Sequence, residues 1–230
     1  MTTLCICGID TGIGKSVVAG LLARFLLEKG QRVITQKPVQ TGCDGQSEDI
    51  LTHRRLMESG WLEEDELRQT CPYTFSFPGS PNLAARLAGQ IIDPNTITAT
   101  TRALEKKYEW VLIEGAGGLM VPLTDNILFI DYLKQQNYPL VLVTSPRLGS
   151  INHTLMSLEL IHARGLKLAG LIYNLHDPAL NEIVQDSRQL FTRILTRNGC
   201  GDRLVTLPKW PDQQTVRWEK ITGTLPPSLE

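Results

Sequence analysis

A glycine-rich stretch near the N-terminus constrains the fold of this chain more than any other feature. Residues Gly8–Ser16 directly follow the short apolar run Leu4–Cys7 and lead into an apolar helical pattern at Ser16–Glu28. Glycines allow backbone N–H groups to approach phosphate oxygens closely, and the positive end of a helix dipole favours a bound anion. A strand, a glycine-rich loop and a helix in this order therefore predict a phosphate-binding loop at the start of an α/β fold.

Two residues at the end of this loop have the chemistry that a nucleoside triphosphate requires. Lys15 can bridge the β- and γ-phosphates, and the hydroxyl of Ser16 can ligate Mg²⁺. Five residues separate Gly8 from Gly14, one more than in the general pattern GxxxxGK(S/T), while the strand–loop–helix context is kept. The alternative is a glycine-rich turn that only joins the strand to the helix.

The rest of the chain alternates short apolar runs with helical patterns, which favours right-handed crossovers and a doubly wound, mostly parallel sheet. The expected strands are Leu4–Cys7, Arg32–Gln36, Trp110–Ile113, Leu140–Thr144, Lys167–Tyr173 and Leu204–Leu207. The expected helices are Ser16–Glu28, Glu48–Met57, Asp93–Lys107, Asn152–Arg164 and Asp177–Arg197, and Trp61–Pro81 is expected to be irregular. We predict an α/β fold of the P-loop NTPase type, with one domain over residues 1–225 and a loose C-terminal tail at 226–230.

Composition and charge exclude several classes of partner. Lys and Arg total 23 and Asp and Glu total 24, and this net charge of −1 argues against a broad basic face for nucleic acid or anionic lipid. No apolar run approaches the roughly 18 residues that a membrane span needs, and Met1–Gly8 lacks the features of a secretion signal. The five cysteines are odd in number and lack metal-ligand spacing. We expect a cytoplasmic protein without a zinc site, in which Cys5 and Cys7 act as small hydrophobes.

The remaining unusual residues follow the other expected strands. They are Lys37–Gly42, Glu114–Gly118, Ser145–Asn152, Asn174 and Pro208. Because ligands bind beyond the carboxyl ends of the strands in open α/β sheets, we expect these segments to form one site together with the glycine-rich loop.

Individual residues of these segments have functional and plainer interpretations. Lys37 directly follows a buried strand, so it could neutralise charge on a transferring phosphoryl group or pair with a nearby carboxylate. Glu114 ends an apolar strand, where P-loop proteins place an acidic residue near the metal; otherwise it is a helix-cap or loop carboxylate. For Asp49, the residues alone favour an ordinary charge at a helix N-terminus. The amide of Asn174 can read a base edge, with adenine favoured over guanine.

Taken together, these motifs closely resemble those of the dethiobiotin synthetases, the ATP-dependent cyclo-ligases of biotin biosynthesis. The longer phosphate loop is itself what this family shows. The matching stretches are Gly8–Ser16 (GxDTxxGK(S/T)), Lys37–Gly42 (KPVxTG), Asp49, Glu114–Gly118 (EGAGG), Pro122–Leu123, Leu148–His153 (LGxINH), Leu168–Gly170, Asn174 and Pro208.

The resemblance implies that the protein joins CO₂ (or bicarbonate) to 7,8-diaminononanoate with ATP and Mg²⁺. One amine becomes a carbamate, the γ-phosphate activates it as a carbamic-phosphoric anhydride, and the second amine closes the ureido ring. Lys15 and Lys37 would be the catalytic residues that stabilise the transferring phosphoryl group. Ser16, Asp49 and Glu114 would surround Mg²⁺.

The resemblance also implies the binding residues and a homodimer. The nucleotide-binding residues would be Gly12, Ile13, Gly14, Lys15, Ser16, Val17, Asp49, Glu114, Gly115, Ala116, Gly117, Asn174 and Pro208. The substrate-binding residues would be Thr41, Ser80, Gly118, Gly149, Ser150, Ile151 and Asn152. In the family the loop at Gly149–Asn152 comes from the second subunit and holds the substrate carboxylate, so the substrate site would lie at a subunit interface.

Two other classes of protein are the alternatives. A ParA/MinD-like ATPase is a partner-binding switch with a signature lysine five residues before the loop lysine, where this chain has Asp10. The ATP-binding module of cobyrinate-type amide ligases is normally fused to a glutamine-hydrolysing domain, for which 230 residues leave no room.

Overall fold

The computed structural model describes residues 1–209 and 215–223, which contain a six-stranded sheet in the order β2-β5-β1-β6-β7-β8. Every pair of neighbouring strands in it is parallel. The strands are β1 (Thr2–Gly8), β2 (Val33–Gln36), β5 (Trp110–Gly118), β6 (Leu140–Thr144), β7 (Leu168–Asn174) and β8 (Leu204–Leu207). β2 and β5 lie on one side of β1, and β6, β7 and β8 lie on its other side, so the chain reverses its winding direction at β1. This reversal confirms the predicted doubly wound parallel sheet.

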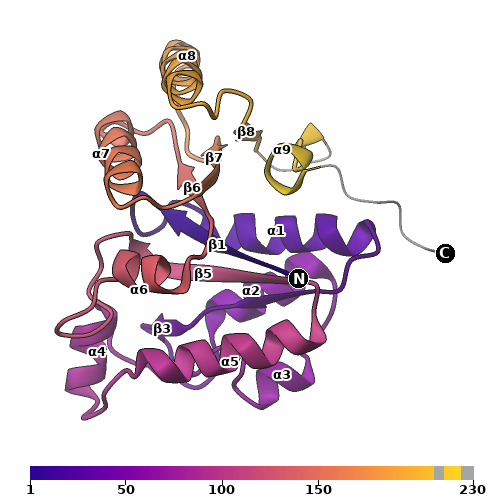
Figure 1. The fold of residues 1–230 in the computed structure, drawn as a ribbon, viewed down its shortest axis with the longest axis vertical. Helices are drawn as coiled ribbons and strands as arrows, with labels where there is room; N and C mark the ends of the chain where they lie inside the picture. The colour runs from indigo at the N-terminus through magenta and orange to yellow at the C-terminus, as the bar shows by residue number, and fades with distance from the viewer. Residues whose placement is uncertain (210–214, 224–230) are drawn as a thin grey trace.

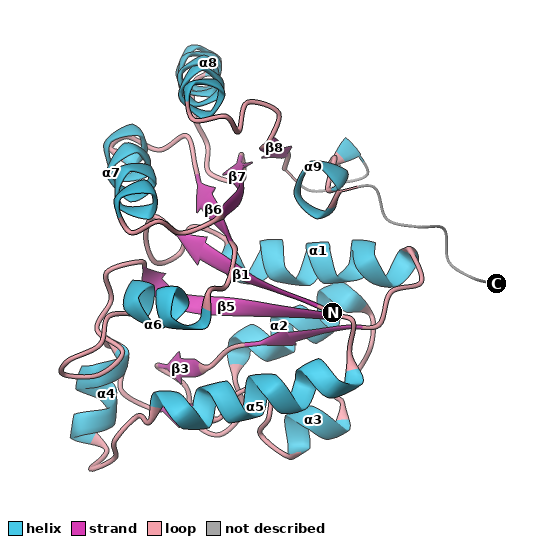
Figure 2. Cartoon of the chain, viewed as in Figure 1, coloured by secondary structure: helices cyan, strands magenta, loops and turns pink. Residues whose placement is uncertain are grey.

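Helices flank this sheet on both faces (Figure 1, Figure 2). They are α1 (Lys15–Glu28), α2 (Glu48–Met57), α3 (Glu63–Glu66), α4 (Pro81–Leu87), α5 (Pro94–Lys107), α6 (Phe129–Gln136), α7 (Ser150–Ala163), α8 (Asn181–Arg197) and α9 (Glu219–Thr222). A second, two-stranded parallel sheet is formed by β3 (Val39–Thr41) and β4 (Tyr73–Phe75). No helix in the described ranges is long and apolar enough to cross a membrane.

Successive side chains of β1 point to opposite faces of the sheet and pack into two separate hydrophobic cores. Leu4 and Ile6 pack into the core beneath α1, and Cys5 and Cys7 pack into the core beneath α5, α6, α7 and α8. All four side chains are buried. Burial raises the pKa of Cys7 to about 12, so its thiol stays protonated at neutral pH. The prediction that Cys5 and Cys7 act as small hydrophobes is confirmed.

Several expected boundaries are wrong in detail. β5 continues through Glu114–Gly118 instead of ending at Ile113, because its carboxyl end keeps pairing with β1 as far as Gly8. The pair Asp177–Pro178 does not cap α8, which begins at Asn181, because an Asp–Pro pair is equally a turn signal.

Short elements were also missed. The stretch expected to be irregular, Trp61–Pro81, contains α3 and β4, while α4, α6 and α9 had no expected counterpart. α7 begins at Ser150, two residues before the expected start at Asn152. The predicted tail at 226–230 lies outside the described residues, so the boundary at residue 225 stays a prediction.

Candidate active site

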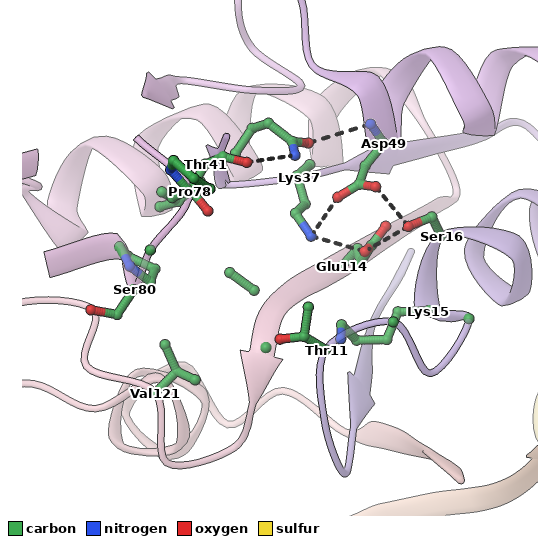
Figure 3. A pocket seen from close by; sticks show the side chains of 18 of the residues that line it. Thr11, Lys15, Ser16, Lys37, Thr41, Asp49, Pro78, Ser80, Glu114 and Val121 are labelled. Carbon is green, nitrogen blue, oxygen red and sulfur yellow. Dashed lines mark hydrogen bonds and ion pairs between the residues drawn. The ribbon is translucent and has the colours of Figure 1, made fainter. Parts of the chain in front are cut away.

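A cavity of about 640 Å³ opens at the carboxyl end of β1 (Figure 3). Its walls come from the β1–α1 loop, the segment from Lys37 to Thr41, the first turn of α2, the end of β5 and the loop before α4. The lining residues are Thr11, Gly12, Gly14, Lys15, Ser16, Val17, Lys37, Val39, Gln40, Thr41, Asp49, Pro78, Gly79, Ser80, Pro81, Glu114, Ala116, Gly117 and Val121. Segments that lie far apart in the sequence therefore meet at one edge of the sheet.

The glycine-rich loop has the backbone conformation that a phosphate cradle needs. Gly14 caps α1 with φ = 94°, in the left-handed region that favours glycine. A Cβ at Gly14 would lie 2.3 Å from the Asn174 Nδ2 atom, which itself donates a hydrogen bond of 3.0 Å to the carbonyl of Ile13. The backbone conformation favours glycine here, and a larger residue would also displace the Asn174 amide from its hydrogen bond with the loop. β7 therefore supports the loop through a residue at its carboxyl end.

Lys15 is buried in this loop, with 6% of its surface exposed, and its Nζ atom donates a hydrogen bond of 2.8 Å to the carbonyl of Asp10. Burial and then the nearby charge of Lys37 lower the pKa of Lys15 to about 8. Lys15 is therefore still largely protonated at neutral pH. Its ammonium group contacts only a carbonyl oxygen among the described hydrogen bonds and ion pairs, which suits it to an incoming anion.

Lys37 lies between two carboxylates at the base of the cavity (Figure 3). Its Nζ atom is 2.8 Å from Asp49 Oδ2 and 2.8 Å from Glu114 Oε1. The Ser16 Oγ atom lies 2.8 Å from Asp49 Oδ1 and 3.0 Å from Glu114 Oε1, so the two carboxylates share its single hydroxyl hydrogen. The plainer interpretation of Lys37, an ion pair with a carboxylate, is thus correct. Since Lys37 also lines the cavity, that pairing leaves it in contact with the site.

Burial and charge have opposite effects in this cluster. Burial alone lowers the pKa of Lys37, but the charges of Glu114 and Asp49 outweigh it, and the pKa is raised. Burial alone raises the pKa of Glu114, but Lys37 and a hydrogen bond from His53 bring it well below the usual range. Lys37 and Glu114 therefore remain ionised at neutral pH although both are buried, with only 5% of the Lys37 surface and 1% of the Glu114 surface exposed.

The start of α2 determines where Asp49 points. Ser47 caps this helix by accepting a hydrogen bond from Ile50 N, and its hydroxyl donates to Gln40 Oε1 at 2.7 Å. The same Gln40 oxygen accepts a hydrogen bond of 3.3 Å from Asp49 N. Asp49 is therefore tied to β3 as well as to its own helix. Asp49 is more than an ordinary charge at a helix N-terminus, because its carboxylate contacts both Ser16 and Lys37.

His53 is a residue of this cluster that the sequence interpretation missed. Its side chain is fully buried, and its Nε2 atom lies 2.7 Å from Glu114 Oε2. A signal was available, since residues four apart on a helix share a face and His53 follows Asp49 by four positions on α2. The sequence alone could not indicate that Glu114 would meet that face.

Some expected site residues are absent from the described lining of this cavity: Ile13, Gly115, Gly118, Asn174, Pro208 and the stretch Gly149–Asn152. Asn174 contacts the back of the glycine-rich loop, and its Oδ1 atom accepts a hydrogen bond from His176 N. Its expected contact with a base stays a prediction. Thr11, Val39 and Gln40 also line the cavity; they lie in the expected loop segments but had no individual role. The sequence interpretation missed four further lining residues, which are Pro78, Gly79, Pro81 and Val121.

The cluster offers oxygen ligands of the kind that Mg²⁺ prefers. The Ser16 hydroxyl lies within hydrogen-bond distance of one oxygen each of Asp49 and Glu114, so three oxygen donors converge at the end of the phosphate loop. Within residues 1–209 and 215–223 there is no group of three or more His, Cys, Asp or Glu side chains that could hold a metal. Mg²⁺ usually takes few protein ligands together with substrate phosphates, so this donor set fits an ion bound with a nucleotide.

Comparison with solved structures identifies the fold. The structure of pNOB8 ParA bound to nonspecific DNA has a TM-score of 0.54 and 12% identity, covering 93% of this chain and 81% of that one. The MinC:MinD cell division protein complex from Aquifex aeolicus has a TM-score of 0.54 and 13% identity, covering 92% and 82%. At such low identity the likeness shows a shared P-loop α/β fold only, and it gives no information about function.

Comparison with known sequences is more specific. The AAA domain family matches residues 2–209. The ATP-dependent dethiobiotin synthetase of Chlorobaculum tepidum is 52% identical over 199 residues, or 86% of this chain and 83% of that protein. The synthetase of Pasteurella multocida is 46% identical over 82% of this chain and 88% of that protein. The synthetase of Halalkalibacterium halodurans is 38% identical over 92% of this chain and 86% of that protein. The chain belongs to the ATP-dependent dethiobiotin synthetase family.

Proposed function

We propose that this protein is an ATP-dependent dethiobiotin synthetase that forms a ureido ring from CO₂ and 7,8-diaminononanoate. The observation that carries the proposal is Lys37, held between Asp49 and Glu114 at the end of a phosphate-binding loop. The family of the chain supplies the substrate class. Phosphoryl transfer depends on positioning and charge neutralisation more than on a covalent nucleophile, and this cluster offers both.

The phosphates of ATP would lie along the β1–α1 loop. The backbone N–H groups from Gly12 to Ser16 would bind the phosphate oxygens at the start of α1. Lys15 would leave the Asp10 carbonyl and bridge the β- and γ-phosphates. Ser16, Asp49 and Glu114 would hold Mg²⁺, which supplies neutralisation of the phosphate charge when bound.

The reaction would follow in three chemical steps at one place. One amine of the substrate adds to CO₂ and loses a proton, giving a carbamate. A carbamate oxygen then attacks the γ-phosphorus, the bond to the β-phosphate oxygen breaks, and ADP leaves. Finally the second amine attacks the carbamoyl carbon of the mixed anhydride, phosphate departs with the C–O bond electrons, and a proton is released. Lys15 and Lys37 would neutralise the charge that moves between the oxygens during the second step.

The cavity suits a small flexible substrate beside the nucleotide. Its volume of about 640 Å³ lies within the usual range for small-molecule sites. Thr41 and Ser80 line it with hydroxyl groups, and Pro78, Pro81 and Val121 line it with apolar surface. The hydroxyls would contact the amine or carbamate end, and the apolar wall would contact the alkyl chain.

The function is tested by the substrate dependence of ATP hydrolysis. Phosphate release is expected to require both bicarbonate and 7,8-diaminononanoate, with one phosphate formed per dethiobiotin, because the γ-phosphate is transferred only to the carbamate. A coupled phosphate assay together with mass spectrometry of the product measures this. Equal phosphate release with and without the diamine would contradict the ligase function and favour an ATPase switch.

We also propose that the protein works as a homodimer in which Gly149–Asn152 binds the substrate carboxylate of the partner subunit. This stretch begins α7 and is absent from the described cavity walls of its own chain. A helix N-terminus offers free backbone N–H groups to a carboxylate. Gly118 would lie near the same end of the substrate, and Pro208 and Asn174 would lie near the base.

Mixing two inactive variants tests the shared site. Lys37→Met removes the phosphoryl contact, and Asn152→Asp places a negative charge where the substrate carboxylate would bind. If each site combines both subunits, unfolding and refolding the two variants together is expected to restore about a quarter of the wild-type sites, through mixed dimers with one intact site. Sedimentation that shows only monomer at micromolar concentration, or no recovered activity in refolded dimers, would contradict the proposal.

A further inference from the structure

The carboxylate of Glu114 is bound on both of its oxygens, and the two sets of partners differ. Oε1 faces the cavity and contacts Lys37 at 2.8 Å and Ser16 at 3.0 Å. Oε2 points the other way and lies 2.7 Å from His53 Nε2, a side chain on α2 with none of its surface exposed. His53 therefore contacts the oxygen that the cavity does not use.

The direction of this hydrogen bond follows from the charge state of Glu114. Oε1 of Glu114 lies 2.8 Å from the Lys37 ammonium group, and this ion pair keeps the carboxylate ionised and therefore an acceptor only. Nε2 of His53 must then carry the hydrogen and donate it. Nδ1 of His53 has no hydrogen-bond partner among the described residues, so the whole polar contact of this imidazole goes to Glu114.

The contact between His53 and Glu114 restrains the rotation of the Glu114 carboxylate, which the cavity residues leave free. The last torsion of a glutamate side chain has a broad, roughly two-fold profile, so bonds to one oxygen alone do not hold the carboxylate plane. A second bond on Oε2, made from a rigid ring on a packed helix, holds that plane. The backbone of α2 is itself tied to β3 through Ser47 and Gln40.

We propose that His53 is a positioning residue that turns Glu114 so that only Oε1 is presented to the metal–phosphate site. The inference rests on the proposed function of this cluster in binding Mg²⁺ with a nucleotide. It adds that Glu114 acts there through a single oxygen, because the second oxygen is taken by His53. Removing a residue that hydrogen-bonds to a metal ligand usually weakens metal binding by about 10- to 100-fold.

The experiment measures binding of Mn²⁺, used as a spectroscopic probe for Mg²⁺, to the full chain with a non-hydrolysable ATP analogue. Electron paramagnetic resonance gives the dissociation constant of Mn²⁺, and calorimetry gives the affinity of the analogue without metal. Three variants are compared: His53→Leu fills the space without a donor, His53→Gln keeps a donor at similar reach, and His53→Asn has an amide that is too short. Met57→Leu, at another buried position one turn further along α2, is the control for helix packing.

We expect His53→Leu and His53→Asn to weaken Mn²⁺ binding by about 10-fold or more, with the metal-free affinity for the analogue unchanged. His53→Gln is expected to stay within about threefold of wild type, because it restores the donor to Oε2. Unaltered Mn²⁺ affinity in His53→Asn, or a loss in His53→Gln as large as in His53→Asn, would overturn the inference. So would an equal loss of metal-free analogue affinity in these variants, since that indicates a structural role only.

The comparison of His53→Asn with His53→Gln is sufficient if His53→Leu fails to fold. The binding measurements need no diamine, so they are independent of dethiobiotin formation. A wild-type protein that binds Mn²⁺ as described but makes no dethiobiotin would contradict the proposed function and leave the role of His53 standing. A wild-type protein that makes dethiobiotin while His53→Asn binds Mn²⁺ normally would contradict the inference alone.

Discussion

Replacing Lys37 with methionine is expected to slow dethiobiotin formation by about 10³-fold while changing nucleotide affinity far less. Two unit charges 4 Å apart contribute about 4 kcal/mol at an effective dielectric near 20. Each 1.36 kcal/mol of transition-state stabilisation corresponds to about tenfold in rate, which gives roughly three decades. The ground state loses less, because Lys15 and the backbone of the glycine-rich loop still bind the phosphates.

The measurement separates kcat from the dissociation constant of ATP. Lys29→Met is the matched control, since Lys29 lies in the exposed turn after α1 and its Nζ atom lies over the ring of Phe25 instead of in the cavity. We expect this control to keep wild-type kinetics. Parallel losses of kcat and of ATP affinity in Lys37→Met would contradict a role for Lys37 in the transition state.

Replacing Arg54 with methionine is expected to lower the free energy of unfolding by about 3–5 kcal/mol, because it leaves a buried carboxylate unpaired. Arg54 is 3% exposed, and its Nε and Nη2 atoms each donate to Asp65 at 2.8 Å. Nη1 also donates to Thr35 Oγ1 at 2.9 Å, which joins α2 to β2. Urea unfolding followed by circular dichroism measures the loss.

Two controls make this result specific to the buried pair. Arg24→Met breaks an exposed pair with Glu28 and Glu58, and such pairs contribute about 0–1 kcal/mol. Adding Asp65→Asn to Arg54→Met removes the unpaired charge and is expected to recover part of the stability. A loss in Arg54→Met no larger than in Arg24→Met would contradict the prediction.

Acid is expected to reduce the difference between Arg54→Met and wild type. Burial raises the pKa of Asp65, but the hydrogen bonds from Arg54 and Thr70 outweigh it, and the pKa is lowered in the folded protein. A carboxylate with a lowered pKa stabilises the folded state in full above its unfolded pKa of about 3.9 and loses this contribution as the pH falls through its folded pKa. The difference between the two proteins should therefore be constant near neutral pH and narrow in strong acid.

The sequence predicted the elements whose signals are local. The glycine-rich loop after β1, the apolar runs of the six strands and the lysine and glutamate that follow two of them depend on residues adjacent in the chain. The rule that parallel strands present their carboxyl ends at one edge then placed Lys37 and Glu114 in the same site. Short elements such as α3 and β4 were missed because four- and three-residue segments are determined by their neighbours in space, which also explains why β5 runs past Glu114.

What the sequence determined by itself is thus the α/β class, the phosphate-binding loop, the family and the identity of the charged residues at the strand ends. The tertiary structure alone decided which of these side chains touch. Ser16 meets Asp49 and Glu114 from 33 and 98 residues away, and His53 meets Glu114 from 61 residues away. The strand order and the rotation of α2 about its axis bring these groups within hydrogen-bond distance. Both follow from long-range packing of the two hydrophobic cores, which no local pattern of residues encodes.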